Sequence, residues 1–207
     1  MQRLLLAYAP AEARDWHGLC WTLDQRLAAV AQRGGDAVIA AIRLAWWDSV
    51  LVEKDAGKGR GEPLVERWRV VAPAGVEPAA GRLIDGWRAL VAPEAMSDTD
   101  LRDYAQARGG GLFALLAAGE GELARVEAAG RLWALWDLAG HVSDAELAER
   151  ALALATEDMN APLPAGRALK PLRLARAIAR PDVAAGRTPG GFTIRHYGRL
   201  LAAALRG

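Results

Sequence analysis

The chain has 207 residues, enough to bury a substantial core, and we expect a single domain spanning 1–207. Lys and Arg number 26 against 25 Asp and Glu, so the formal net charge of +1 gives no support to nucleic-acid binding. One cysteine, Cys20, excludes an internal disulfide and a cysteine zinc cluster, and this fits a reducing compartment.

Composition also indicates the fold class. Ala and Leu dominate, β-branched runs are rare, and eight Trp against two Phe and three Tyr favour large surfaces that pack between helices. These features predict an all-α fold. No segment approaches the ~18 apolar residues of a membrane span, and the N-terminal run of three leucines is short for a signal peptide. We therefore expect a cytoplasmic protein with no transmembrane segment.

The first predicted helix begins near Pro10, which suits a first-turn position, and runs to Arg33. Gly34 and Gly35 end it. Asp36 is then placed to cap the next helix.

That next helix, AVIAAIRLAWWDSVL at 37–51 and continuing to about residue 54, is the most apolar helical segment of the chain. Ile39, Ile42 and Trp46 recur at helical spacing, and Arg43 is the only charge between residues 37 and 47. The pattern predicts a buried helix with Arg43 pointing inward. A buried cation needs a partner, and an internal carboxylate is favoured over an anionic ligand.

Prolines and capping residues delimit three further helices. Pro63 begins one that Pro73 closes, and another covers residues 76–90. Ser97 and Asp100 form a capping pattern for a longer helix.

That longer helix contains three consecutive glycines, Gly109 to Gly111. Each costs about 1 kcal/mol in a helix relative to Ala. The glycines therefore indicate either a break or kink in the helix, or a second element that packs very close to its backbone.

The remaining sequence predicts a helix at 121–142, one that Ser143 caps and that runs to about Met159, a basic helix at 167–180 and a closing helix at 190–207, about nine helices in all. The five cations of the basic helix are interpreted as a solvated face, with attachment to an anionic membrane as the alternative.

Common catalytic motifs are missing from the sequence. It holds no nucleophile elbow, phosphate loop or zinc spacing. His17 and His196 are far in sequence from any Asp or Cys pattern, so packing is favoured over catalysis for both.

Several short motifs occur in a recognisable order: YAP at 8–10, LDQRLAAV at 23–30, IRLAWW at 42–47, GEPL at 61–64, Tyr104 followed by Gly110, and GRLWAL at 130–135. Their order resembles the squalene/phytoene synthase family. The closest similarity is to its short bacterial members and to the mitochondrial relative that acts as an assembly factor for respiratory complex I. The resemblance extends from Tyr8 to about Arg180.

The resemblance implies an isoprenoid-synthase fold with a central cavity, where two aspartate-rich motifs hold magnesium ions that bind prenyl diphosphates. Carboxylates one helical turn apart suit this hard cation. Aligned on the first motif, however, the carboxylate positions fall on Ala28, Ala29 and Gln32. A shifted register offers Asp24, whose i+4 neighbour is again Ala28.

Aligned on the second motif, the two aspartate positions fall on His141 and Ala145, and the preceding asparagine on Asp137. Asp137 and His141 are spaced i, i+4 and could contact one metal, but a solvated or ion-paired surface is favoured. With both clusters lost, the resemblance implies no resident metal and no catalytic residue.

We therefore expect a pseudoenzyme that acts as a scaffold and binds a protein partner or an isoprenoid lipid. One role that the resemblance implies for such a scaffold is the assembly of a respiratory complex. Peripheral contact with a membrane is a further expectation. The alternative is a prenyl-diphosphate transferase with a divergent site, which would need magnesium. Trp46 and Trp47 are expected to fill space that active relatives leave open for substrate. The candidate cavity or ligand-binding residues are Arg43, Trp47, Tyr104, Gly110, Asp137 and His141.

Overall fold

The computed structural model describes residues 2–31, 36–91, 95–190 and 193–206, and every regular element within these ranges is helical, which confirms the predicted all-α fold. The α-helices are α1 (Gln2–Ala7), α2 (Arg14–Ala31), α3 (Ala37–Leu51), α4 (Pro63–Val71), α5 (Glu77–Ala89), α6 (Asp98–Tyr104), α7 (Gly111–Ala117), α8 (Leu123–Ala139), α9 (Ala145–Ala155), α10 (Lys170–Val183) and α11 (Ile194–Arg206). Short turns of helix are η1 (Ala11–Ala13), the π-helical η2 (Ala105–Gly110) and η3 (Thr156–Asp158).

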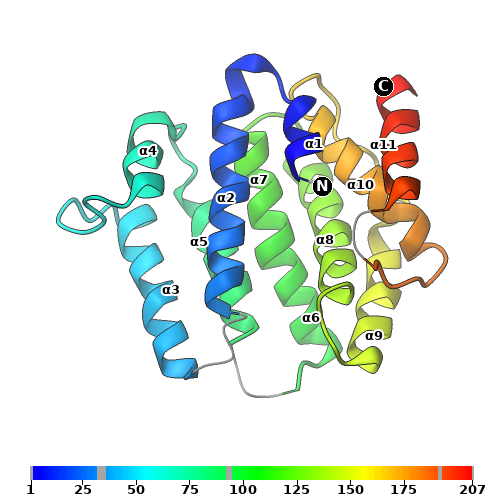
Figure 1. The fold of residues 1–207 in the computed structure, drawn as a ribbon, viewed down its shortest axis with the longest axis horizontal. Coiled ribbons are helices and arrows are strands. Elements are labelled where there is room, and N and C mark those ends of the chain that lie inside the picture. Colours follow the sequence, from blue (N-terminus) through cyan, green and yellow to red (C-terminus); the bar gives the residue numbers. More distant parts are fainter. Residues whose placement is uncertain (1, 32–35, 92–94, 191–192, 207) are drawn as a thin grey trace.

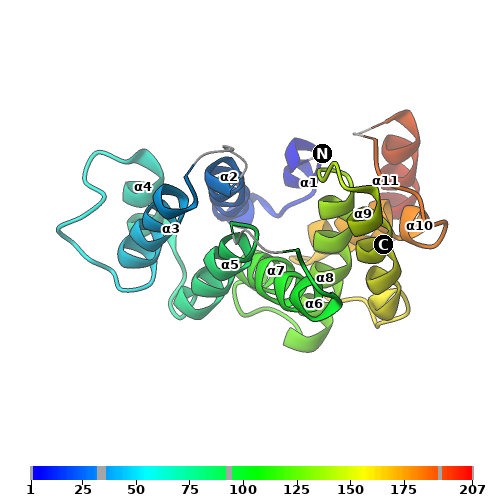
Figure 2. The same cartoon turned by 90° about the horizontal axis from the view of Figure 1, so that it is seen from below.

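α8 lies near the middle of the helical array and packs against η2, α7, α9 and α10 (Figure 1). Seen from below, α2 and α3 lie on one side of the molecule and α5, α6 and α7 on the other (Figure 2). The core is rich in tryptophan: the Trp133 ring of α8 lies 5.3 Å from that of Trp21 and 5.7 Å from that of Phe113. None of the described helices is both long and apolar enough to cross a bilayer.

Several predicted helix ends are confirmed. An Asp36 carboxylate oxygen accepts a hydrogen bond from the Val38 amide at 2.8 Å, and Ser97 and Asp100 form a reciprocal capping box. Pro63 occupies the first turn of α4. The prediction for Ser143 is wrong, because the carboxylate of the next residue, Asp144, accepts the hydrogen bonds at the start of α9.

The N-terminal helix differs from its prediction. The chain forms α1 first, then a 3-10 turn that follows Pro10, and α2 begins at Arg14. The predicted end of this helix at Arg33 to Gly35 lies outside the described residues. Pro10 does precede a helical turn, as the local sequence predicts. The separate helix α1 contacts α2 and α10, and such long-range contacts cannot be predicted from the local sequence.

α3 has the predicted bounds at 37–51, but the prediction that Arg43 points into the core is wrong, because Arg43 is exposed. α3 lies at one edge of the molecule and packs against α2, α4 and α5 with one side only (Figure 1). That side carries Leu44 and Trp47, whereas Ile39 and Ile42 are exposed with Arg43. Apolar periodicity identified the helix but assigned its buried side incorrectly.

At the glycine triplet the structure shows close packing of a second helix, which is one of the two predicted alternatives. The chain stays helical through Gly109 as the π-helical turn η2, which passes into α7 at Gly111. A Cβ atom built on Gly109 would lie 2.3 Å from the Gly130 carbonyl oxygen of α8, and one on Gly130 would lie 2.2 Å from the Gly109 oxygen. The two backbones therefore touch where neither residue has a side chain.

The basic segment forms α10, and it is not simply a solvated face. Its apolar side packs on α8 and α11, and Arg176 is buried, donating to the carbonyl oxygens of Asp158 and Met159 at 3.2 and 2.8 Å. His196, which the sequence places far from any Asp or Cys pattern, is buried and meets an aspartate in the structure. Its Nε2 atom donates to Asp182 Oδ2 at 2.9 Å, because a turn folds α11 back onto α10.

The ionised Asp182 should stabilise the contact between α10 and α11 in a pH-dependent way. Burial would raise the pKa of this carboxyl, but hydrogen bonds from Arg199 and His196 outweigh burial and lower the pKa from 3.8 to about 2. Since the folded-state pKa is depressed, this stabilisation is present above the unfolded-state pKa of ~3.9 and is lost as the pH falls toward 2.

We therefore expect Asp182→Asn to lower the free energy of unfolding by about 1–3 kcal/mol at neutral pH, and this deficit to shrink toward pH ~2. Urea unfolding at several pH values measures both effects. Asp103→Asn, at an exposed position of α6, is the matched control and should change little. A deficit that stays constant across this pH range would contradict the assignment.

Candidate functional site

A cavity of about 770 Å³ opens between α2, α5, α6, α8 and α9, with Gln2 of α1 at its edge. Its walls are largely apolar and include Ala28, Ala29, Leu90, Met96, Leu138 and Leu147. Volumes of this size are typical of small-molecule sites. The cavity therefore has the dimensions and the apolar lining of a ligand-binding site.

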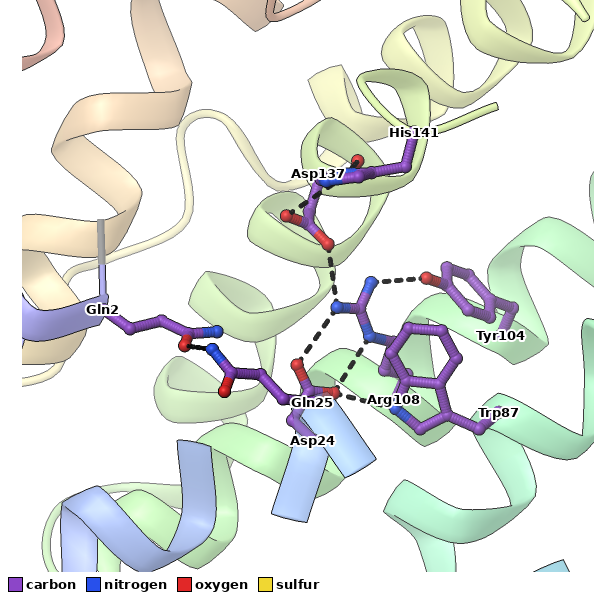
Figure 3. A network of polar contacts seen from close by, with 8 residues as sticks. All are labelled: Gln2, Asp24, Gln25, Trp87, Tyr104, Arg108, Asp137 and His141. Carbon is purple, nitrogen blue, oxygen red and sulfur yellow. Dashed lines mark hydrogen bonds and ion pairs between the residues drawn. The ribbon is translucent and has the colours of Figure 1, made fainter. Parts of the chain in front are cut away.

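Arg108, which projects from η2, forms the polar floor of this cavity (Figure 3). It is only 3% exposed. Its Nε and one terminal nitrogen donate to the two carboxylate oxygens of Asp24 on α2, both at 3.2 Å, and the same terminal nitrogen donates to Asp137 of α8 at 2.7 Å. The other terminal nitrogen donates to the Tyr104 hydroxyl at 2.6 Å. The guanidinium thus bridges carboxylates from two facing helices.

Aromatic rings enclose the same cation. The guanidinium carbon of Arg108 lies 4.2 Å from the centre of the Trp87 ring and 5.0 Å from that of Trp133, both within cation–π range. Trp87 also donates its indole N–H to Asp24 at 2.8 Å. The two rings therefore add cation–π contacts to the ion pairs of the guanidinium.

Arg108 and Tyr104 at the floor both keep their protons near neutral pH. Burial by itself would lower the pKa of Arg108, but the charges of its neighbours, Asp24 first among them, outweigh burial and raise that pKa well above its ordinary value. Burial raises the pKa of the Tyr104 hydroxyl to about 12, so this group stays protonated. One cation between two carboxylates leaves the floor with a net charge of −1.

The local sequence explains how Arg108 reaches this position. Tyr104 ends α6 and Arg108 follows four residues later in the π-helical turn η2, so the two side chains share one face and both line the cavity. α5 can approach because it carries Gly86 there: a Cβ atom at Gly86 would lie 2.4 Å from the Arg108 backbone nitrogen. The close contact with α5 therefore fixes the position of the Arg108 backbone.

The rim adds further charge. Asp144, Glu146 and Arg150 line the cavity beside His141, so the lining residues that the structure describes include four carboxylates and two guanidinium groups. His141 is exposed, and its Nδ1 donates to the Asp137 carbonyl oxygen at 2.7 Å. The amides of Gln2 and Gln25 contact each other at the edge (Figure 3). The cavity as a whole is therefore weakly anionic.

Three of the candidate residues from the sequence meet at this cavity, namely Tyr104, Asp137 and His141. The other three do not line it. Arg43 is exposed on α3, Trp47 is buried on the same helix against Trp46 with ring centres 4.9 Å apart, and Gly110 faces Gln106 and Glu127.

Among the described lining residues the tryptophan is Trp87, not Trp47, and the central cation is Arg108. Sequence reasoning missed both. The available signal was the i, i+4 spacing of Arg108 and Tyr104 next to the glycine triplet.

The donor set does not suit the magnesium cluster that the resemblance implies for active relatives. Asp24 and Asp137 both direct oxygens at Arg108, and no group of three or more His, Cys, Asp or Glu among the described residues is arranged to hold a metal ion. In comparisons with known proteins, no family model matches the chain, and neither the curated proteins nor the solved structures give a significant match.

Proposed function

We propose that the chain is a non-catalytic member of the squalene/phytoene synthase family, whose cavity binds an apolar ligand such as an isoprenoid lipid. One observation carries the proposal: Arg108 lies between Asp24 of α2 and Asp137 of α8 and donates hydrogen bonds to both carboxylates. An internal cation thus occupies the place where divalent cations would have to bridge the two helices.

The position of the aligned residues supports the family assignment. Ala28 and Ala29, which align with the first aspartate-rich motif, line the cavity from α2. Asp137 and His141, which align with the second, line it from α8 and its C-terminal end. Residues more than a hundred positions apart therefore meet around one cavity, as the resemblance implies for facing motifs.

The charge of the lining determines which ligand fits. Four carboxylates against two guanidinium groups in the described part of the lining disfavour a prenyl diphosphate, because its negative charges would enter a weakly anionic site without a metal to neutralise them. Apolar walls favour a hydrocarbon chain with an uncharged polar end, which the rim side chains could hydrogen-bond. The family resemblance alone leads us to propose that this ligand binding serves the assembly of a respiratory complex.

Binding of farnesol tests the proposal. Native mass spectrometry should detect a complex of the purified protein with farnesol, whereas farnesyl diphosphate without metal should bind at least about tenfold more weakly. Ala29→Trp, which fills the cavity wall, should abolish the farnesol complex.

Ala45→Trp, at an exposed position of α3, is the matched control and should bind farnesol as the wild type does. The proposal fails if the wild-type protein does not bind farnesol, or if Ala29→Trp binds it equally well. Isolation of the protein from its own cells with a protein partner and no lipid would instead support a scaffold for proteins.

A further inference from the structure

The outward side of α11 carries a row of apolar residues that no described element covers. Ile194, Tyr197, Leu201 and Leu205 follow one another at intervals of three, four and four residues, so they form one stripe along the helix. Ile194 is 86% exposed and Leu205 is 88% exposed. We call these four residues the α11 stripe.

This stripe is distinct from the side by which α11 joins the protein. Leu200 and His196 point inward and are buried against α10 and its neighbours. α11 is therefore anchored by one side and presents a second apolar side outward. Single exposed apolar residues are common on protein surfaces, but a continuous row along a helix marks an interaction surface.

The charges of the chain are distributed unevenly around this helix. Residues 166–207 contain nine Lys and Arg and a single acidic residue, Asp182, whereas residues 1–165 contain 17 basic and 24 acidic residues. The net charge of +1 thus combines a strongly basic C-terminal part with an acidic remainder. A partner of α11 meets a cationic surface.

Some of these cations gather at the start of the α11 stripe. A second cavity of about 300 Å³ lies there, lined by Arg187, Arg195, Arg199, Thr188, Thr193 and His196. Asp182 accepts hydrogen bonds from two of the arginines, at 3.4 Å from Arg187 and 2.9 Å from Arg199. Three guanidinium groups beside one carboxylate leave this cavity cationic, as a phosphate group requires.

A cation also lies near the other end of the stripe. Lys170, in the first turn of α10, donates to the carbonyl oxygen of Ala204 at 2.9 Å, and its ammonium lies 5.8 Å from the centre of the Tyr8 ring. Cations therefore lie near both ends of the apolar row. Such a combination is characteristic of helices that lie in the interface of a bilayer.

We propose that α11 docks the protein on the surface of an anionic phospholipid bilayer. The α11 stripe enters the boundary between headgroups and acyl chains, and the cavity with Arg187, Arg195 and Arg199 receives lipid phosphates. Because no described helix can cross a bilayer, the contact is peripheral. Charge argues against a second copy as the occupant, since pairing two stripes would bring two cationic surfaces together.

Co-sedimentation with vesicles tests this surface. The protein should sediment with phosphatidylcholine vesicles that contain about a third of phosphatidylglycerol, and added salt should weaken binding. The double variant Leu201→Gln/Leu205→Gln should bind at least about tenfold more weakly, because it removes apolar area from the stripe without altering charge. Ile42→Gln, at a 64% exposed position of α3, is the matched control and should bind as the wild type does.

A second variant separates charge from apolar contact. Arg195→Gln should weaken binding to the anionic vesicles about fivefold and leave binding to pure phosphatidylcholine unchanged. Circular dichroism should give the same helix content for all variants, since every changed residue is exposed.

Equal binding to neutral and anionic vesicles would overturn the proposal, as would full binding by the stripe variant. A wild-type dimer that the stripe variant converts to a monomer, with neither form binding vesicles, would identify a second copy as the occupant and would also overturn it. These outcomes do not depend on whether the cavity at Arg108 binds a ligand.

Discussion

Replacement of Arg108 with methionine is expected to lower the free energy of unfolding by about 3–5 kcal/mol, measured by urea unfolding. Methionine fills similar space but leaves Asp24 buried without its cation and Asp137 without its closest donor. A buried carboxylate that has lost its cation is far more costly than the loss of one favourable hydrogen bond, even though Trp87 still donates to Asp24. The large effect follows from the burial of the pair.

Two further variants show whether the effect arises from the ion pairs. Arg108→Lys keeps the charge but cannot bridge two carboxylates and a hydroxyl, so it should fall between the wild type and Arg108→Met. In the double variant Arg108→Met/Asp24→Asn, the loss should be smaller than the sum of the single losses, because the unpaired charge is gone. Losses that add to within about 0.5 kcal/mol would contradict the bridging role of Arg108.

Gly109→Ala and Gly130→Ala should each destabilise the protein by about 3 kcal/mol or more. The added Cβ atoms would lie 2.3 and 2.2 Å from backbone oxygens of the facing helix, so η2 and α8 would have to separate. Separation would also displace Arg108, the neighbour of Gly109. Thermal unfolding followed by circular dichroism measures the effect.

Gly110→Ala provides the matched control in the same triplet. Its Cβ atom would meet the side-chain amide of Gln106 at 3.2 Å, and that flexible group can move. The loss should therefore be below about 1 kcal/mol, since Ala favours the helix and offsets part of the contact. Equal losses at Gly109 and Gly110 would show that the cause is chain flexibility and not the close approach of α8.

Much of the fold could be predicted from the sequence because its signals are local. The all-α class follows from composition, and the starts of α3, α4 and α6 follow from Asp36, Pro63 and Ser97, whose caps or prolines act within a few residues. At the glycine triplet the sequence allows both a break and a close approach of another helix, and only the position of Gly130 on α8 distinguishes the two.

The buried side of α3 could not be predicted correctly. Apolar residues occupy most of its surface, so periodicity does not distinguish the side facing α5 from the exposed side with Ile42 and Arg43. A helix at the edge of a domain can leave apolar residues exposed, and the sequence alone does not reveal that it is at the edge.

The centre of the candidate site depends on contacts between residues far apart in the chain. Arg108 meets Asp24 and Asp137, which are 84 and 29 positions away. The family resemblance brought the segments of Asp24 and Asp137 to attention, but the cation between them belongs to no motif in that pattern. Arg108 could be identified only from the structure, where it lies in η2 and where Gly86, which has no side chain, lets α5 approach its backbone.

The central claim is that Arg108 replaces the metal ions on which catalysis in the resembled family depends. Incubation of the purified protein with farnesyl or geranylgeranyl diphosphate and magnesium, followed by chromatography of extracted hydrocarbons, tests it most directly. We predict no release of pyrophosphate and no squalene- or phytoene-type product. Formation of either hydrocarbon by the wild-type protein, and its loss in Asp24→Asn or Asp137→Asn, would contradict the claim and establish the chain as an enzyme.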